Sequence, residues 1–103
     1  MNASIKKAVN IIVRTADPEK VILFGSAAKG EKKKPADYDL LILKSNIKKK
    51  RQMGRRIYMN FRDIGAPIDI IVEETSKYEE LKSNPVYIYY DISKSGKVIY
   101  EKH

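Results

Sequence analysis

Hydrophobic residues recur along this chain with two different periods, and each change of period marks a new element. Near the N-terminus, apolar residues fall three and four positions apart, which is the spacing of one face of an α-helix. Asn2 or Ser4 can cap this helix, and Asp17-Pro18 ends it, because the residue before a proline is disfavoured in the helical region. The predicted inner face consists of Ile5, Ala8, Val9, Ile12 and Ala16.

Short apolar runs bounded by glycine, proline or charged residues predict the strands. Residues 21–24 form a β-branched run that is too short for a buried helix and favours a buried strand. The runs at 37–43 and 68–72 have the same character, and residues 98–100 predict a last short strand. Between the first two strands, Ala27-Ala28-Lys29 predicts one turn of helix closed by Gly30. Residues 31–35, with three consecutive lysines, predict a solvated loop, and an exposed charged tip is favoured there over a dedicated binding role.

The segment after the second strand predicts a long amphipathic helix. Ser45 or Asn46 can cap it, and Gly65 can stop it near residue 64. Its inner stripe would be Ile47, Met53, Ile57, Phe61 and Ile64. Its outer face carries a dense basic band of Lys48, Lys49, Lys50, Arg51, Arg55, Arg56 and Arg62. Two interpretations of this band are equally balanced, an ordinary solvated face and a surface that recruits a nucleotide or an acidic partner.

The C-terminal third predicts two more helices. Ser76 and Glu79 form a capping box, which indicates a short helix containing Tyr78. Residues 86–90 have the composition of a strand, but Asn84-Pro85 is typical of a cap and a first helical turn, so we expect a helix over 85–95. The order α, β, short α, β, α, β, α, α, β contains no linker. It predicts a single domain over residues 1–103, of the α/β or α+β class, with one small sheet.

Composition narrows the range of functions. The 103 residues carry a formal net charge of +8, which implies attraction to an anionic partner such as a nucleotide, a nucleic acid or an acidic protein surface. The absence of cysteine excludes disulfides and thiolate metal sites within the chain. No apolar run approaches membrane-spanning length, and the N-terminus lacks the apolar core of a signal peptide. We therefore expect no membrane partner and a cytoplasmic location.

The candidate chemistry lies at the ends of the first two strands. Gly25-Ser26 can bring N–H groups and a hydroxyl close to a phosphate, because glycine has no Cβ to block the approach. Asp37 and Asp39 are two positions apart, so in a strand they point to the same face. Neighbouring carboxylates repel each other unless a cation lies between them, and Mg²⁺ prefers oxygen ligands. The competing interpretation is an ordinary tight turn, with the aspartates capping a turn or pairing with the lysines of the loop.

Asp69 is a third candidate, although a single acid at the start of a strand is frequently only a rim residue. Gly25-Ser26, ten intervening positions, Asp37-Tyr38-Asp39 and a later strand carrying Asp69 together resemble the signature of the DNA polymerase beta-type nucleotidyltransferase superfamily. The short length and the ending NPVYIYYDISKSGKVIYE resemble its smallest branch, the minimal nucleotidyltransferase (MNT) domains. The resemblance covers nearly the whole chain. It implies the nucleotidyltransferase fold, a small mixed β-sheet flanked by helices.

The same resemblance implies roles for individual residues. Asp37 and Asp39 would bind two Mg²⁺ ions that neutralise the triphosphate of ATP, and Asp69 would complete the second metal site and help to deprotonate the acceptor. The terminal phosphates would be held by Gly25, Ser26 and Lys29.

Many MNT domains act as antitoxins paired with HEPN-domain toxins. By that analogy, this chain would transfer AMP from ATP to a tyrosine hydroxyl of a cognate HEPN toxin, which would lose its ribonuclease activity. The alternative is a binding module that neutralises the toxin by steric occlusion. Ala27, where relatives usually carry arginine or tyrosine, and Ala36, where many carry serine, keep this alternative open, and Tyr38 replaces the usual aliphatic residue. Direct nucleic-acid binding through residues 44–62 ranks last, because no aromatic stacking platform is evident beside that band.

Overall fold

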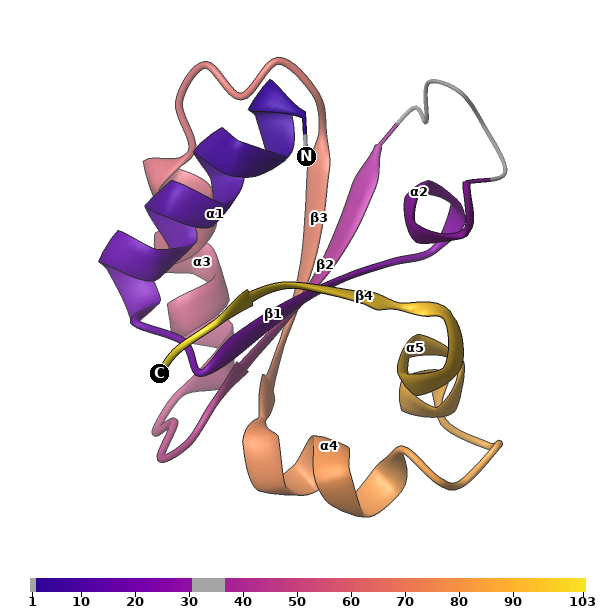
Figure 1. Cartoon of the computed structure of the whole chain (residues 1–103). Coiled ribbons are helices and arrows are strands. Elements are labelled where there is room, and N and C mark those ends of the chain that lie inside the picture. Colours follow the sequence, from indigo (N-terminus) through magenta and orange to yellow (C-terminus); the bar gives the residue numbers. More distant parts are fainter. Residues whose placement is uncertain (1, 31–36) are drawn as a thin grey trace.

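The fold is a four-stranded mixed sheet with helices on both faces, as the computed structural model shows (Figure 1). The structure describes residues 2–30 and 37–103, so the expected loop at 31–35 and Ala36 lie outside the described residues. No helix within these two ranges is long and apolar enough to cross a membrane. The elements are α1 (Ala3–Ala16), β1 (Lys20–Phe24), α2 (Ser26–Lys29), β2 (Tyr38–Lys44), α3 (Lys50–Asn60), β3 (Ile68–Glu74), α4 (Thr75–Leu81), α5 (Ile88–Ser95) and β4 (Lys97–Glu101).

The strand order β3-β2-β1-β4 brings distant parts of the sequence together at one end of the sheet. β1 runs antiparallel to β2 and β4, whereas β2 and β3 are parallel and are joined by the crossover through α3. The end of β1 therefore lies beside the starts of β2 and β3. In this register Phe24 is the partner of Asp39, and Asp39 is the partner of Asp69.

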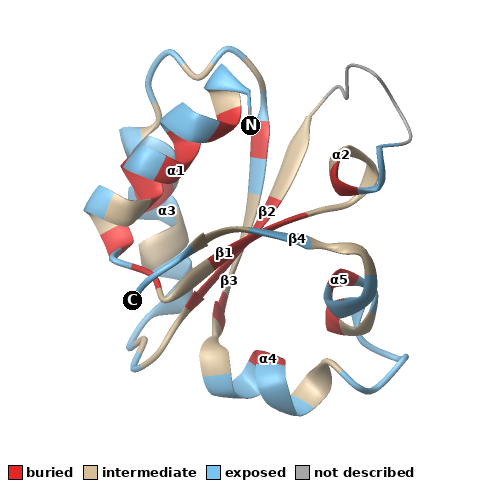
Figure 2. Ribbon diagram, viewed as in Figure 1, coloured by how far each residue is buried: buried red, intermediate tan, exposed pale blue. Residues whose placement is uncertain are grey.

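The two faces of the sheet are covered by different helices (Figure 2). On one face Leu40 and Ile42 pack with residues of α1 and α3, among them Ile12 and Ile57. On the other face Leu41 and Leu43 pack with residues of α4 and α5. Because successive strand residues alternate between faces, Asp39 belongs to the α4 and α5 face. α4 begins where β3 ends, so it lies at the opposite end of that face from the aspartates (Figure 1).

The first helix forms as its sequence predicts. The Asn2 side chain caps it by accepting a hydrogen bond from the Ile5 N–H at 2.9 Å. All five residues predicted for its inner face are buried, and Asp17 ends it in the left-handed conformation with φ 47°. α2 also forms over one turn, and Gly30 closes it with a left-handed φ of 69°.

The predicted cap of α3 is wrong, because long-range contacts occupy the groups concerned. α3 begins after Lys49, since the Ser45 hydroxyl donates to Glu19 at 2.9 Å and the N–H groups of Asn46 and Ile47 donate to the Glu74 carboxylate. It ends at Asn60, ahead of Gly65.

Two boundaries in the C-terminal part also differ from the prediction. Ser76 lies inside α4, which starts at Thr75 without a side-chain cap, so the capping box does not form. α5 is a helix as expected, but it begins at Ile88 rather than at Pro85, because residues 84–87 form a turn closed by the Tyr87 N–H to the Asn84 carbonyl at 3.1 Å.

Candidate active site

Three carboxylates gather at the end of the sheet where β2 and β3 start. Asp39 and Asp69 are partners on adjacent parallel strands, so their side chains leave the same face. Asp37 directly precedes β2. Partial burial raises the pKa of Asp39, and the negative charges of Asp37 and Asp69 raise it further. The structure therefore places the three predicted acids at one end of the sheet, with Asp39 and Asp69 as direct neighbours.

The three acids do not form a preassembled metal site. Within residues 2–30 and 37–103, no three Asp, Glu, His or Cys side chains lie close enough together to hold one metal ion as they stand. Mg²⁺ does not require three protein ligands, because it is commonly bound by one or two carboxylates plus the phosphate oxygens of a substrate. The repulsion acting on Asp39 is relieved by a bound cation or by a proton. The donor set therefore fits a hard divalent cation bound together with a phosphate.

Gly25 lies directly against the Asp39 carboxylate. Its backbone has φ 74° and ψ −156°, a conformation that is essentially restricted to glycine. A Cβ on Gly25 would lie only 2.6 Å from the Asp39 Oδ2 atom. The carbonyl of Gly25 accepts from the N–H groups of Ala28 and Lys29 at 3.2 Å each. The N–H groups of Ser26 and Ala27 come before these hydrogen bonds and, like the first N–H groups of any helix, have no acceptor within the helix. The turn therefore presents N–H donors beside the acids.

Gly25→Ala is expected to damage both the turn and the acid group. The left-handed backbone costs about 1 to 3 kcal/mol for a residue with a side chain, and the new methyl group displaces the Asp39 carboxylate. The measurement is urea unfolding together with binding of Mg²⁺ and ATP by calorimetry. Gly30→Ala is the matched control, because Gly30 also has a positive φ, of 69°, but no atom of residues 2–30 and 37–103 lies within 4 Å of its added Cβ. Equal losses of binding in both variants would contradict a specific role for Gly25.

The remaining positions of the signature are placed as follows. Lys29 is exposed at the end of α2 and, among the described residues, makes no hydrogen bond or ion pair with the acids, so its phosphate-binding role stays a prediction. Ala27 packs against the core beneath α1 and α3. Tyr38 packs against the same core, and its hydroxyl accepts from the Asn2 side chain at 2.6 Å. The tyrosine between the aspartates therefore points away from the acid group.

Sequence reasoning missed a second polar centre on the same face. Glu73 is 4% exposed and accepts hydrogen bonds from the Tyr89 hydroxyl at 2.8 Å and the Lys50 ammonium at 3.0 Å. The sequence position of Glu73 could have revealed it. Residues two apart in a strand point to the same face, so Glu73 follows Asp69 and Ile71 toward the α4 and α5 face. Its contacts tie β3 to α3 and α5, so its role is structural.

A mixed sheet that places strand-borne aspartates beside a Gly-Ser turn defines a small α/β domain of the nucleotidyltransferase class. Residues 6–103 match the family described as "Polymerase beta, Nucleotidyltransferase", and the chain belongs to that family. No curated protein matches the chain significantly. The resemblance and the fold expected from the sequence are confirmed.

Two solved structures have a similar fold. A presumed nucleotidyltransferase from Sulfolobus solfataricus is 17% identical with a TM-score of 0.61, and the match covers 99% of this chain and 90% of that one. A crystal structure of a toxin-antitoxin with AMP-PNP contains a chain that is 14% identical with a TM-score of 0.62, covering 95% of this chain and 73% of that one. At these identities the likeness shows the fold alone.

Proposed function

We propose that this chain is a Mg²⁺-dependent nucleotidyltransferase that transfers AMP from ATP to a tyrosine hydroxyl of a cognate HEPN toxin and thereby acts as its antitoxin. The observation that carries the proposal is the pairing of Asp39 with Asp69 against Gly25. Membership of the polymerase beta nucleotidyltransferase family supports the transfer chemistry. The likeness of fold to a toxin-antitoxin structure crystallised with AMP-PNP supports the choice of nucleotide and of partner class.

The acids and the turn have distinct roles in this proposal. Asp37 and Asp39 hold Mg²⁺, and Asp69 completes the site for a second ion. When bound, Mg²⁺ neutralises phosphate charge and makes an oxygen nucleophile easier to deprotonate. The Ser26 hydroxyl and the N–H groups of the turn donate to the terminal phosphate oxygens, where the missing side chain of Gly25 leaves room for them. Lys29 adds positive charge.

The transfer step balances with the groups available in the complex. The tyrosine oxygen of the partner forms a bond to the α-phosphorus of ATP, the bond to the β-phosphate oxygen breaks, and pyrophosphate leaves. Asp69 is exposed whereas Asp39 is half-buried, so Asp69 is the carboxylate that an incoming acceptor reaches first. Asp69 therefore accepts the tyrosine proton.

The test uses ATP labelled at the α-phosphate, MgCl₂ and the protein encoded by the neighbouring reading frame. We expect label to enter that protein and to resist denaturation, and we expect Asp37→Ala with Asp39→Ala to reduce labelling to the level without enzyme. Mass spectrometry locates the AMP on a tyrosine. Failure of the wild-type chain to label a partner that it binds, at millimolar ATP and Mg²⁺, would contradict the proposal.

The second candidate function is inhibition of the toxin by occlusion without catalysis. It is favoured by Ala27, whose side chain packs into the core and supplies no phosphate contact where relatives carry a larger polar group. The discriminating experiment compares binding and protection of cells by the wild-type chain and by the double aspartate variant. Equal protection at equal affinity for the toxin would establish occlusion, whereas loss of protection with retained binding supports transfer.

A further inference from the structure

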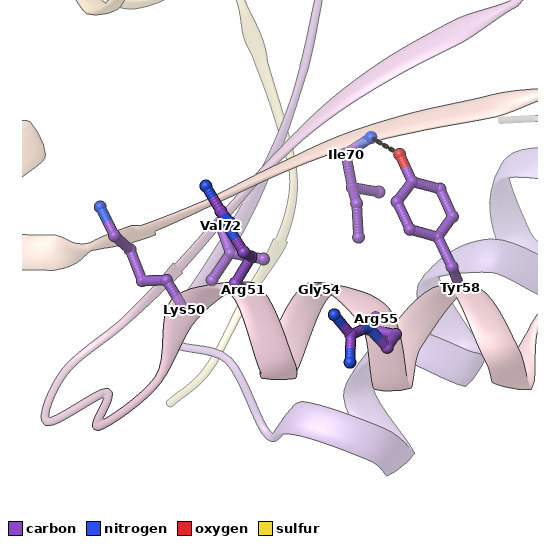
Figure 3. Close-up of a pocket in the computed structure, with 7 residues that line it drawn as sticks. All are labelled: Lys50, Arg51, Gly54, Arg55, Tyr58, Ile70 and Val72. Carbon is purple, nitrogen blue, oxygen red and sulfur yellow. Dashed lines mark hydrogen bonds between the residues drawn. The ribbon is translucent and has the colours of Figure 1, made fainter.

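A groove of about 620 Å³ runs between α3 and the edge strand β3 (Figure 3). Ile70 and Val72 of β3 form its apolar wall, and they pack on the α1 and α3 face of the sheet, opposite to the three acids. Gly54 of α3 lines the groove without a side chain, and a Cβ there would lie in ordinary contact, 3.8 Å from a Val72 methyl carbon. A larger side chain at Gly54 would fill this space.

The rim of the groove is strongly basic. Lys50, Arg51 and Arg55 line it (Figure 3), and within the described residues neither arginine has an ion-pair partner. Lys50 contacts the buried Glu73 at 3.0 Å and remains half-exposed. Residues 45–62 contain no Asp or Glu, and their seven cations are those of the basic band. The potential over the groove is therefore positive and favours an anionic occupant.

The wall of the groove is also an unpaired sheet edge. β3 pairs only with β2 among the described strands. The Tyr38 N–H donates to the Pro67 carbonyl. Because main-chain groups alternate in direction along a strand, the N–H and carbonyl groups of Asp69, Ile71 and Glu73 point toward β2. Those of the even-numbered residues of β3 point outward.

Two of the outward N–H groups of β3 already have side-chain partners. The Tyr58 hydroxyl accepts from the Ile70 N–H at 2.8 Å, as Figure 3 shows, and the Glu73 carboxylate accepts from the Glu74 N–H at 2.9 Å. The main chain of Val72 lies between these two capped positions. Its N–H and carbonyl face the groove and can pair with another extended chain.

We propose that this groove binds an extended acidic segment of a partner protein, whose main chain pairs with β3 at Val72 and whose carboxylates contact Arg51 and Arg55. Arginine holds carboxylates in two-point geometry, and the aliphatic wall accepts the alternate apolar side chains of such a strand. A nucleic acid fits this groove less well. Tyr58 is the single aromatic ring lining it, its hydroxyl is already hydrogen-bonded to β3, and the outward carbonyls repel phosphates. The surface is separate from the three acids and does not depend on the transfer chemistry.

The test measures fluorescence anisotropy of a labelled ten-residue peptide that alternates Glu and Val, at physiological salt. We expect saturable binding that Arg51→Glu with Arg55→Glu weakens by at least about tenfold. Lys48→Glu with Lys49→Glu is the matched control, because it makes the same change of charge outside the groove, and we expect a loss of less than about threefold. Equal losses in the two double variants would overturn the proposal, since they would show attraction by net charge alone.

A second set of measurements tests the shape of the site. Gly54→Leu fills the groove without changing charge and is expected to weaken peptide binding by about tenfold while the circular dichroism spectrum is retained. In the wild-type chain, hydrogen exchange at the Val72 amide is expected to slow when the peptide is added, which remains decisive if Gly54→Leu fails to fold. An unchanged Val72 exchange rate at saturating peptide would overturn strand pairing. Tighter binding of a ten-nucleotide oligothymidylate, lost in the Arg51 and Arg55 variant, would assign the groove to nucleic acid and overturn the proposal.

Discussion

Asp39→Asn is expected to slow nucleotidyl transfer strongly while making the metal-free protein more stable. The amide keeps the size of the side chain but removes the charge that binds the cation, and loss of one charge-stabilising group of this kind costs about 10² to 10³ in rate. The stability gain has a separate cause. Burial and the charges of Asp37 and Asp69 raise the pKa of Asp39, so its charged form is disfavoured in the folded state. Removing that charge is therefore expected to raise the free energy of unfolding at neutral pH.

The pH dependence follows from the sign of this pKa shift. A raised folded-state pKa means that the contribution of Asp39 to stability is fully present below its ordinary pKa of 3.8 and is lost as the pH rises through the higher folded value. The advantage of Asp39→Asn over the wild-type chain should therefore be largest at neutral pH and should disappear in acid. Urea unfolding across this pH range, without added metal, measures it.

Added Mg²⁺ should reverse the order of stability. A ligand that binds only the folded state stabilises it by about 2.7 kcal/mol at a concentration one hundred times its Kd, so MgCl₂ with ATP should raise the melting temperature of the wild-type chain. Asp39→Asn should not respond. Asp63→Asn, the same change at an exposed loop residue, serves as the control and should behave as the wild-type chain does. Equal shifts in all three proteins, or full transfer by Asp39→Asn, would show that Asp39 does not hold the metal.

Local patterns in the sequence predicted the element order because each signal acts over a few residues. The face of α1, the Asn2 cap and the short α2 all depend on neighbours within one or two helical turns, and all formed as expected. The spacing of Asp37 and Asp39 predicted both on one strand face, but β2 begins at Tyr38, so Asp37 lies just before the strand and only Asp39 lies within it. Adding Asp69 required the family resemblance, because its position beside Asp39 depends on the strand order rather than on spacing.

The features that sequence reasoning missed depend on contacts between distant residues. Glu74, distant in sequence but paired with Lys44 in the sheet, accepts hydrogen bonds from the main-chain groups of Asn46 and Ile47 that would have opened α3 earlier. The groove beside β3 exists because Gly54 and Val72 come together, and Tyr58 reaches Ile70 only once α3 has packed on the sheet. An aromatic residue does lie beside the basic band, which the chain order alone did not reveal. Each of these contacts requires the register of the folded sheet.

Removing the Glu73 carboxylate is expected to destabilise the fold more than any change at the acid group. Burial by itself raises the pKa of Glu73, but hydrogen bonds from Tyr89, Lys50 and the Glu74 N–H outweigh it, so the pKa lies below its ordinary value. Burial, together with the pairing to Glu73, raises the pKa of the Tyr89 hydroxyl. The carboxylate is therefore charged and fully partnered in the folded state, where it joins β3 to α3 and α5.

Glu73→Ala should lower the free energy of unfolding by about 3 kcal/mol, because it leaves the Tyr89 hydroxyl buried without an acceptor and opens a cavity. Tyr89→Phe should cost about 1 to 3 kcal/mol, since a buried carboxylate loses one donor. The control is Glu79→Ala, which removes an exposed glutamate whose ion pair with Lys82 is screened by solvent, so we expect little change in the free energy of unfolding. Urea unfolding at neutral pH gives these differences.

Unfolding measurements at acidic pH distinguish the contribution of the Glu73 charge to stability from that of its packing. Because the folded-state pKa is lowered, the contribution of the charge is present above the ordinary pKa of 4.5 and is lost as the pH falls through the folded value. The gap between the wild-type chain and Glu73→Ala should therefore narrow in acid toward the cost of the cavity alone. A gap that stays constant across this range would mean that Glu73 acts by filling space and that its bonds to Tyr89 and Lys50 add nothing to stability.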